Sequence, residues 1–148
     1  MKKTLILTAL AVTALLIAGC AAATNSLDDN RQKWQQQDID DYDFTIQVLC
    51  FCLDDVTRPV RIEVRGGIVQ SMVYADDSTA VTNDYFDDIN TIEKLFQVID
   101  DAIEDDADEL IIDYDLGFGF PKKIDIDFLL NAVDDEITYT ISGFTSYN

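Results

Sequence analysis

The strongest constraint on the fold is a set of short segments in which apolar and polar residues alternate. The first covers residues 42–52, the second covers residues 60–65, and residues 68–74 follow after Gly66-Gly67. Successive side chains of a strand point to opposite faces, so this period of two predicts strands with one buried face. Because two glycines suit a tight turn with positive φ, the second and third segments are predicted to form a hairpin.

Two other segments carry helix signals. In the first segment Ser26 is the predicted N-cap, and Trp34 lies on the apolar face of the helix predicted after it, where it would pack on the sheet. In the second segment Asn90 is the predicted N-cap, with Glu93 at the capping-box position. The apolar residues that follow have helical spacing and predict a buried stripe: Ile92, Leu95, Phe96, Ile99 and Ile103.

Three more strands are predicted after the second helix, over residues 110–116, 122–128 and 136–144. Residues 117–121 would form the first of their turns, whereas the polar stretch of residues 76–90 is expected to be a loop. A helix followed by three strands thus occurs twice, as a tandem αβββ repeat would give. We predict an α+β fold with an antiparallel sheet of about six strands and two helices packed on one face.

The N-terminus has the organisation of an export signal. Basic residues 2–3 precede an apolar segment, residues 5–17, which is shorter than the roughly 20 residues of a membrane span. Residues 17–20 read Ile-Ala-Gly-Cys. This ending differs from the A-x-A site of an ordinary signal peptide and resembles the lipobox of bacterial lipoproteins. The resemblance implies that residues 1–19 are removed and that the Cys20 thiol is acylated.

The chain is therefore predicted to consist of a signal peptide (1–19), an acylated cysteine with a short tether (20–25) and one α+β domain (26–148). About 130 residues are enough for one core and too few for two. The expected location is the bacterial cell envelope, anchored in a membrane through the lipid. Because Ala21 and not an aspartate follows the cysteine, the outer membrane facing the periplasm is favoured over the inner membrane.

Charge and composition exclude several classes of function. The chain has 10 basic and 29 acidic residues, a net charge of −19 that becomes −21 when Lys2 and Lys3 leave with the signal peptide. Without a basic surface, binding to nucleic acid is not expected. Histidine is absent, which removes Ser-His-Asp and Cys-His catalysis and the usual zinc sites. We therefore expect no enzymatic activity and no cofactor.

Cys50 and Cys52 form the first candidate site. On one continuous strand they would share the core face with Phe44, Ile46 and Val48. Three interpretations stay open: a local structural disulfide, two buried free thiols, and a redox or soft-metal site. On an extended strand the Cα atoms of these two residues would lie near the upper distance limit for a disulfide. Such a bond would be strained, which favours its reduction.

Four aspartates form the second candidate, on the predicted hairpin: Asp113, Asp115, Asp125 and Asp127. If the turn is centred near Gly119, Asp113 faces Asp125, Asp115 faces Lys123, and Asp127 lies on the same outer face. Like charges in such positions repel, which indicates either a bound cation or charges that water screens well enough to be tolerated. No segment matches the calcium-binding loop of EF-hands. Calcium binding through these carboxylates therefore remains an alternative.

One set of residues in a fixed order resembles a known family, and it spans nearly the whole predicted domain. The set comprises Trp34, Tyr42-Asp43-Phe44, Cys50-Phe51-Cys52, Pro59-Val60, Gly66-Gly67, Phe96, Tyr114-Asp115, Gly119-Phe120-Pro121, Ile124, Asp127 and Asp134-Asp135-Glu136. It resembles domain of unknown function 6174, a family of uncharacterised bacterial envelope proteins. The resemblance implies a secreted or lipid-anchored protein and supplies no activity, substrate or partner.

Two functional hypotheses follow. The first is a lipid-anchored, non-enzymatic module that binds another envelope component through its sheet face or its aromatic turns. The second is a redox or metal-binding protein that uses Cys50 and Cys52. The lipid anchor, the small domain and the missing catalytic residues favour the first hypothesis.

Overall fold

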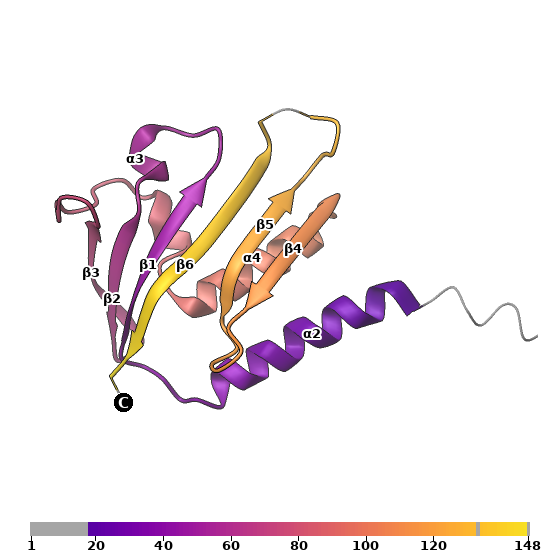
Figure 1. Ribbon diagram of the computed structural model, residues 1–148, viewed down its shortest axis with the longest axis horizontal. Coiled ribbons are helices and arrows are strands. Elements are labelled where there is room, and N and C mark those ends of the chain that lie inside the picture. The colour runs from indigo at the N-terminus through magenta and orange to yellow at the C-terminus, as the bar shows by residue number, and fades with distance from the viewer. Residues whose placement is uncertain (1–17, 133, 148) are drawn as a thin grey trace, which may run out of the picture.

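The computed structural model describes residues 18–132 and 134–147 (Figure 1). The helices are α2 (Ala18–Gln35), α3 (Asp54–Thr57), α4 (Ile92–Glu104) and the 3-10 helix η1 (Tyr85–Asp88). The strands are β1 (Tyr42–Leu49), β2 (Val60–Arg65), β3 (Ile68–Tyr74), β4 (Glu109–Tyr114), β5 (Pro121–Asp127) and β6 (Glu136–Ser146). They form one antiparallel sheet of six strands in the order β3-β2-β1-β6-β5-β4, which confirms the predicted α+β fold.

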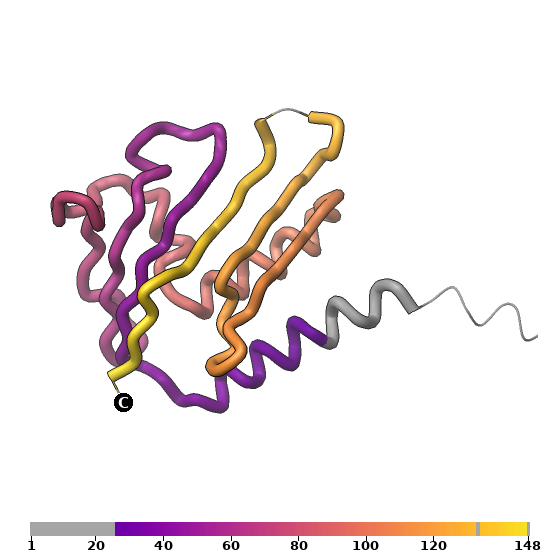
Figure 2. Tube along the Cα trace, in the orientation of Figure 1, coloured from indigo at the N-terminus to yellow at the C-terminus, as the bar shows by residue number. Residues whose placement is uncertain are grey.

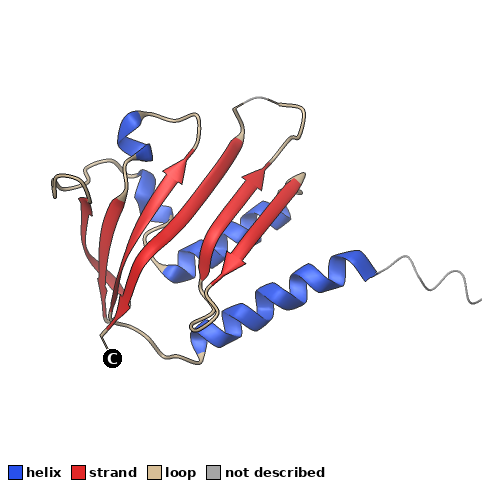
Figure 3. Ribbon diagram, in the orientation of Figure 1, coloured by secondary structure: helices blue, strands red, loops and turns tan. Residues whose placement is uncertain are grey.

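One face of the sheet is buried and the other is open. In β1 the side chains of Tyr42, Phe44, Ile46 and Val48 are buried, and the residues between them are half-buried. Helix α4 lies across the buried face, behind the sheet in Figure 3. Helix α2 joins α4 at one end of the core, where Arg31 forms a 2.7 Å ion pair with Asp100 of α4.

Helix α4 follows the predicted stripe with two differences. Ile92, Leu95, Phe96 and Ile99 are buried, but Ile103 in the last turn is 44% exposed and Ala102 is buried instead. The N-cap is Thr91, one residue later than predicted, because its Oγ1 accepts a hydrogen bond from the Lys94 amide at 3.3 Å. Glu93 is therefore free of the capping role and turns toward α2.

Helix α2 begins earlier than the sequence signals indicate. Its backbone is helical from Ala18, so Ser26 lies inside the helix and not at its N-cap. The helix also runs through residues 20–25, where a short tether is predicted. Nearly all of the predicted signal peptide, residues 1–17, lies outside the described residues. None of the helices in the described part of the chain has the length and apolar character needed to cross a membrane.

Each half of the chain contributes three sequential antiparallel strands to the sheet, in the order β3-β2-β1 and β6-β5-β4. β1, the first strand of the first half, is central and pairs with β6, the last strand of the second half. β4, the first strand of the second half, lies at an edge. The two halves thus share an order of elements, and a tandem repeat stays a prediction.

The connection between β3 and α4 contributes to the core. Figure 2 traces residues 76–90 from the β3 edge back toward α4 behind the sheet. Within this stretch η1 holds Phe86 fully buried, and Ile89 is 4% exposed. The prediction of a simple loop is therefore wrong for its second half, because these two apolar side chains fill space that the sheet and α4 leave between them.

Candidate binding surface

The two candidate cysteines lie in the loop after β1. The strand ends at Leu49, and Cys50 and Cys52 are joined by a disulfide with their Cα atoms 5.2 Å apart. Two residues of a strand span about 6.7 Å, so the chain bends here to bring the cysteines within bonding range. Cys52 is exposed and Cys50 is half-buried. The prediction that both continue β1 on its core face is therefore wrong, although Cys50 still packs against the core. A redox role for the pair stays a prediction.

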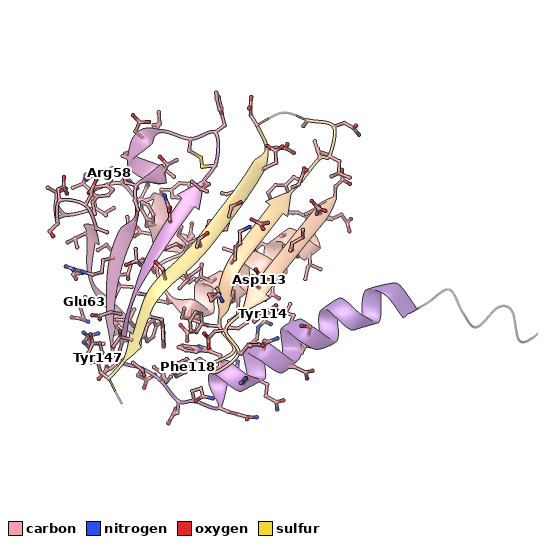
Figure 4. All side chains as sticks on the ribbon, in the orientation of Figure 1. Arg58, Glu63, Asp113, Tyr114, Phe118 and Tyr147 are labelled. Atoms are coloured by element: carbon pink, nitrogen blue, oxygen red, sulfur yellow. A yellow bond between two sulfur atoms is a disulfide. The ribbon has the colours of Figure 1, made fainter. Side chains whose placement is uncertain are left out.

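This loop carries apolar side chains that face solvent. Phe51, between the two cysteines, is 83% exposed, Leu53 is 76% exposed and Leu49 is 53% exposed. At the same end of the sheet the β5–β6 connection exposes Leu129 and Leu130, each at 60% (Figure 1). We call these five side chains the apolar rim. Figure 4 shows the disulfide, drawn in yellow, at this end. Exposed apolar side chains that gather in one region mark interaction sites more often than scattered ones do.

A row of carboxylates crosses the open face beside the apolar rim. The strand register places Glu136 of β6 opposite Asp127 of β5, and Asp127 opposite Glu109 of β4. We call these three residues the acidic row. Among the residues that the structure describes, no lysine or arginine forms an ion pair with any of them. Like charges directly opposite one another destabilise a sheet, so the acidic row lowers the stability of the fold unless a cationic group covers it.

The protonation of Asp127 reflects this crowding. Partial desolvation raises the pKa of its carboxyl group, and the charges of Asp135, Glu136 and Asp108 raise it further. A hydrogen bond from the Leu129 amide to Oδ1, at 3.1 Å, acts in the opposite direction. The folded protein thus holds this proton more tightly than a free aspartate would.

A second row of paired residues lies next to the acidic row and crosses β1, β6, β5 and β4. Its two end residues are apolar and its two middle residues are polar. Leu49 pairs with Thr138, Thr138 with Asp125, and Asp125 with Ile111, which is 51% exposed. Asp125 accepts hydrogen bonds from Lys123 Nζ at 2.6 Å and from Thr138 Oγ1 at 2.7 Å. Burial alone would raise the pKa of Asp125, but these two hydrogen bonds lower it. The residues of the two rows other than Leu49 line a hollow of about 240 Å³, to which Ile126 also contributes.

The four candidate aspartates do not converge. Asp113 pairs with Lys123 and not with Asp125, and Asp115 lies in the turn, where its Oδ1 accepts hydrogen bonds of 2.8 Å from the amides of Gly117 and Phe118. The predicted register is wrong because it places the centre of the turn near Gly119. The Asp115 side chain instead closes a turn whose centre lies nearer to β4. Across the described residues, no three acidic or cysteine side chains are placed to hold a metal ion. Calcium binding through these carboxylates stays a prediction.

A second polar cluster joins α2 to α4. Trp34 Nε1 donates to Glu93 Oε1 at 2.8 Å, and the Tyr42 hydroxyl donates to Glu93 Oε2 at 3.4 Å. Burial, followed by the charge of Glu93, raises the pKa of Tyr42. The Arg31 guanidinium lies 5.3 Å from the centre of the Phe96 ring. Each of these polar groups has a partner within the protein, so this cluster holds α2 against α4.

The aromatic turns, which were an alternative binding patch, also belong to the core. Phe120 is 3% exposed, and its ring centre lies 4.6 Å from that of Phe144 and 6.1 Å from that of Trp34. Phe118 packs against Phe144 at 5.1 Å and lies beside α2, as does Tyr114 (Figure 4). The exposed surface at the other end of the sheet is the stronger candidate.

Fold and surface together define a small α+β domain with one covered and one open sheet face. The chain matches a family of unknown function, DUF6174, over residues 26–146, from within α2 to the end of β6. It belongs to this family. Comparisons with curated proteins and with solved structures find no significant match.

The acidic row gives a first testable prediction. Because the pKa of Asp127 is raised on folding, its ionisation opposes folding as the pH rises through that pKa. We expect Asp127→Asn to raise the melting temperature at neutral pH, with the difference shrinking as the pH falls and Asp127 becomes protonated. Thermal melts at a series of pH values measure this.

Asp125 is the matched control, since its pKa is lowered and not raised. Its ionised form supports folding above the usual aspartate pKa, and that support is lost as the pH falls. Asp125→Asn should therefore lower the melting temperature at neutral pH and have little effect in acid. Effects of the same sign for the two variants would contradict the prediction.

Proposed function

We propose that this protein is a non-enzymatic binding module, anchored at a bacterial envelope membrane by acylation of Cys20, that docks a basic partner protein. The observation that carries the proposal is the juxtaposition, at one end of the sheet, of the apolar rim and the acidic row. A basic partner would relieve the repulsion within the row, and apolar contact with the rim would supply affinity.

The disulfide loop suits such docking. Phe51 stands between two linked cysteines, so its backbone has little freedom left to lose on binding. Buried aromatic side chains commonly supply much of the energy of an interface. The nearby Asp54 and Asp55 make an anionic lipid surface an unfavourable target for the same loop.

The lipid anchor rests on residues 17–20, which resemble a lipobox. Export and acylation would place the domain in the envelope, and Ala21 favours the outer membrane facing the periplasm. Because the domain begins within a few residues of Cys20, the anchor would keep it close to the membrane surface.

We expect Cys20→Ala to leave a longer precursor that incorporates no labelled fatty acid, because no other residue there offers the thiol that is acylated. Mass spectrometry of the mature N-terminus and metabolic labelling measure this. A variant with Cys50 and Cys52 both replaced by alanine is the control and should be labelled normally. Normal labelling of Cys20→Ala would refute the anchor.

Docking is tested in intact cells with a photo-crosslinking amino acid at position 51. The control carries it at position 116, because Leu116 is 91% exposed in the turn at the other end of the sheet. We expect a partner crosslinked from position 51 alone, through a segment with basic residues. Adding Asp127→Asn and Glu136→Gln should reduce its yield several-fold. The same products from both positions, or a yield unaffected by the neutralising substitutions, would rule out docking at this surface.

A further inference from the structure

The two edges of the sheet differ in how they are protected. At the β3 edge the chain returns after the strand, and the Tyr74 amide donates to the Thr79 carbonyl at 2.9 Å. The Val81 amide donates to the Met72 carbonyl at 3.1 Å, and Val73 and Ala80 form an isolated antiparallel bridge. Residues 79–81 therefore cover part of the β3 edge.

The opposite edge, β4, has no such cover among the described residues (Figure 3). Its six residues pair with β5 on one side, and no backbone hydrogen bond from another described segment reaches its outer side. In an edge strand alternate residues direct N–H and C=O groups outward, which makes the edge a template for a further strand.

The side chains of β4 indicate what such a strand would carry. On the core face, Leu110 and Ile112 are only half-buried, although Ile126 and Ile124 opposite them are 3% and 0% exposed. The missing neighbour on their outer side explains this difference. Apolar side chains at alternate positions of an added strand would complete their burial.

The other face of β4 is acidic. Glu109 and Asp113 flank Ile111 on the open face, and all three side chains are exposed. A second copy of this chain is a poor occupant, because antiparallel pairing of two β4 strands with the same face outward sets Glu109 opposite Asp113 of the other copy. The net charge of −19 adds repulsion between copies. Basic side chains at the remaining alternate positions would be complementary.

We propose that β4 accepts an extended segment of the partner as a seventh strand, with basic side chains on the open face and apolar side chains on the core face. This inference rests on the proposed function and specifies its binding mode: main-chain hydrogen bonds supply affinity, and the alternating side chains supply selectivity. Glu109 belongs both to β4 and to the acidic row, so the added strand adjoins the docking surface.

The test uses the purified full-length protein and an end-capped seven-residue peptide of alternating lysine and valine. Hydrogen exchange measured by mass spectrometry should show the amides of β4 protected on binding, with those of β3 unchanged. A peptide of the same sequence with every backbone nitrogen methylated keeps the charges and side chains but lacks amide donors. We expect it to bind at least tenfold more weakly.

The outcomes separate the binding mode from the proposed function. Equal binding of the methylated peptide, protection at β3, or no binding of either peptide would each overturn strand addition. The crosslinking experiment at position 51 could still succeed in each case, because it needs no free sheet edge. Conversely, Glu109→Gln with Asp113→Asn should weaken binding of the unmodified peptide several-fold, and unchanged binding would overturn the predicted role of the acidic side chains.

Discussion

Replacing Trp34 with alanine is expected to lower the free energy of unfolding by about 3–5 kcal/mol. The side chain is 4% exposed and makes edge-on contacts with Tyr42, Phe120 and Phe144, at ring-centre distances of 5.6, 6.1 and 5.8 Å. It also donates the 2.8 Å hydrogen bond to Glu93. Removing it takes away a buried aromatic attachment of α2 to the core and leaves Glu93 with one fewer donor. Urea denaturation followed by circular dichroism measures the loss.

Two further substitutions show which part of Trp34 matters. Trp34→Phe keeps an aromatic ring and removes the donor to Glu93, so a loss of about 1–2 kcal/mol is expected. Leu116→Ala changes a side chain that is 91% exposed and should alter stability by less than about 0.5 kcal/mol. A loss below about 1 kcal/mol for Trp34→Ala would mean that α2 is not docked as described.

The second large effect is expected at Gly119, where Gly119→Ala should cost on the order of 3 kcal/mol. Gly119 has a φ of +87°, which strains any residue with a side chain. A Cβ there would lie 2.6 Å from the Asn30 carbonyl oxygen and 2.9 Å from Lys33 Cβ, both in α2. The helix or the turn would have to move. Denaturant unfolding of the variant measures the cost.

Gly117→Ala is a matched control in the same turn. Gly117 does not have a positive φ, and a Cβ there would approach only the Asp115 carboxylate, at 3.3 Å. We expect its effect to stay below about 1 kcal/mol. Equal losses for the two variants would show that the turn as a whole, and not its contact with α2, determines the cost.

Much of the secondary structure could be predicted because its signals are local. The alternation before and after Gly66-Gly67 depends only on neighbouring residues, and β2 and β3 pair as an antiparallel hairpin there. The stripe from Ile92 to Ile99 likewise follows from the period of a helix. Asn90 and Thr91 are adjacent and both can act as a helix N-cap, so the predicted N-cap of α4 was one residue too early.

Other features depend on contacts that no local pattern reveals. Phe86 lies in a polar stretch, and its complete burial reflects the space it fills in the core. The end of β1 at Leu49 could not be read from the alternation, which continues to Cys52, because the bend that brings the cysteines together interrupts the strand.

The candidate surface was the least predictable feature. Its carboxylates come from three strands, and which of them face one another depends on register. The turn at residues 115–120 shifts the β4–β5 pairing by two residues relative to one centred on Gly119, because the Asp115 side chain closes it. That shift separates Asp113 from Asp125 and aligns Glu109 with Asp127.

The sequence by itself determined the charge, the absence of histidine, the α+β class and the family resemblance, since these depend on composition, periodicity and the order of residues. Only the tertiary structure decided that β1 and β6 are central, that β4 is an open edge, and that Glu109, Asp127 and Glu136 form one row. The physical reason is that strand order and register are set by side chains packing between segments far apart in the chain. Local periodicity shows which face of a strand is buried, but not which strand lies beside it.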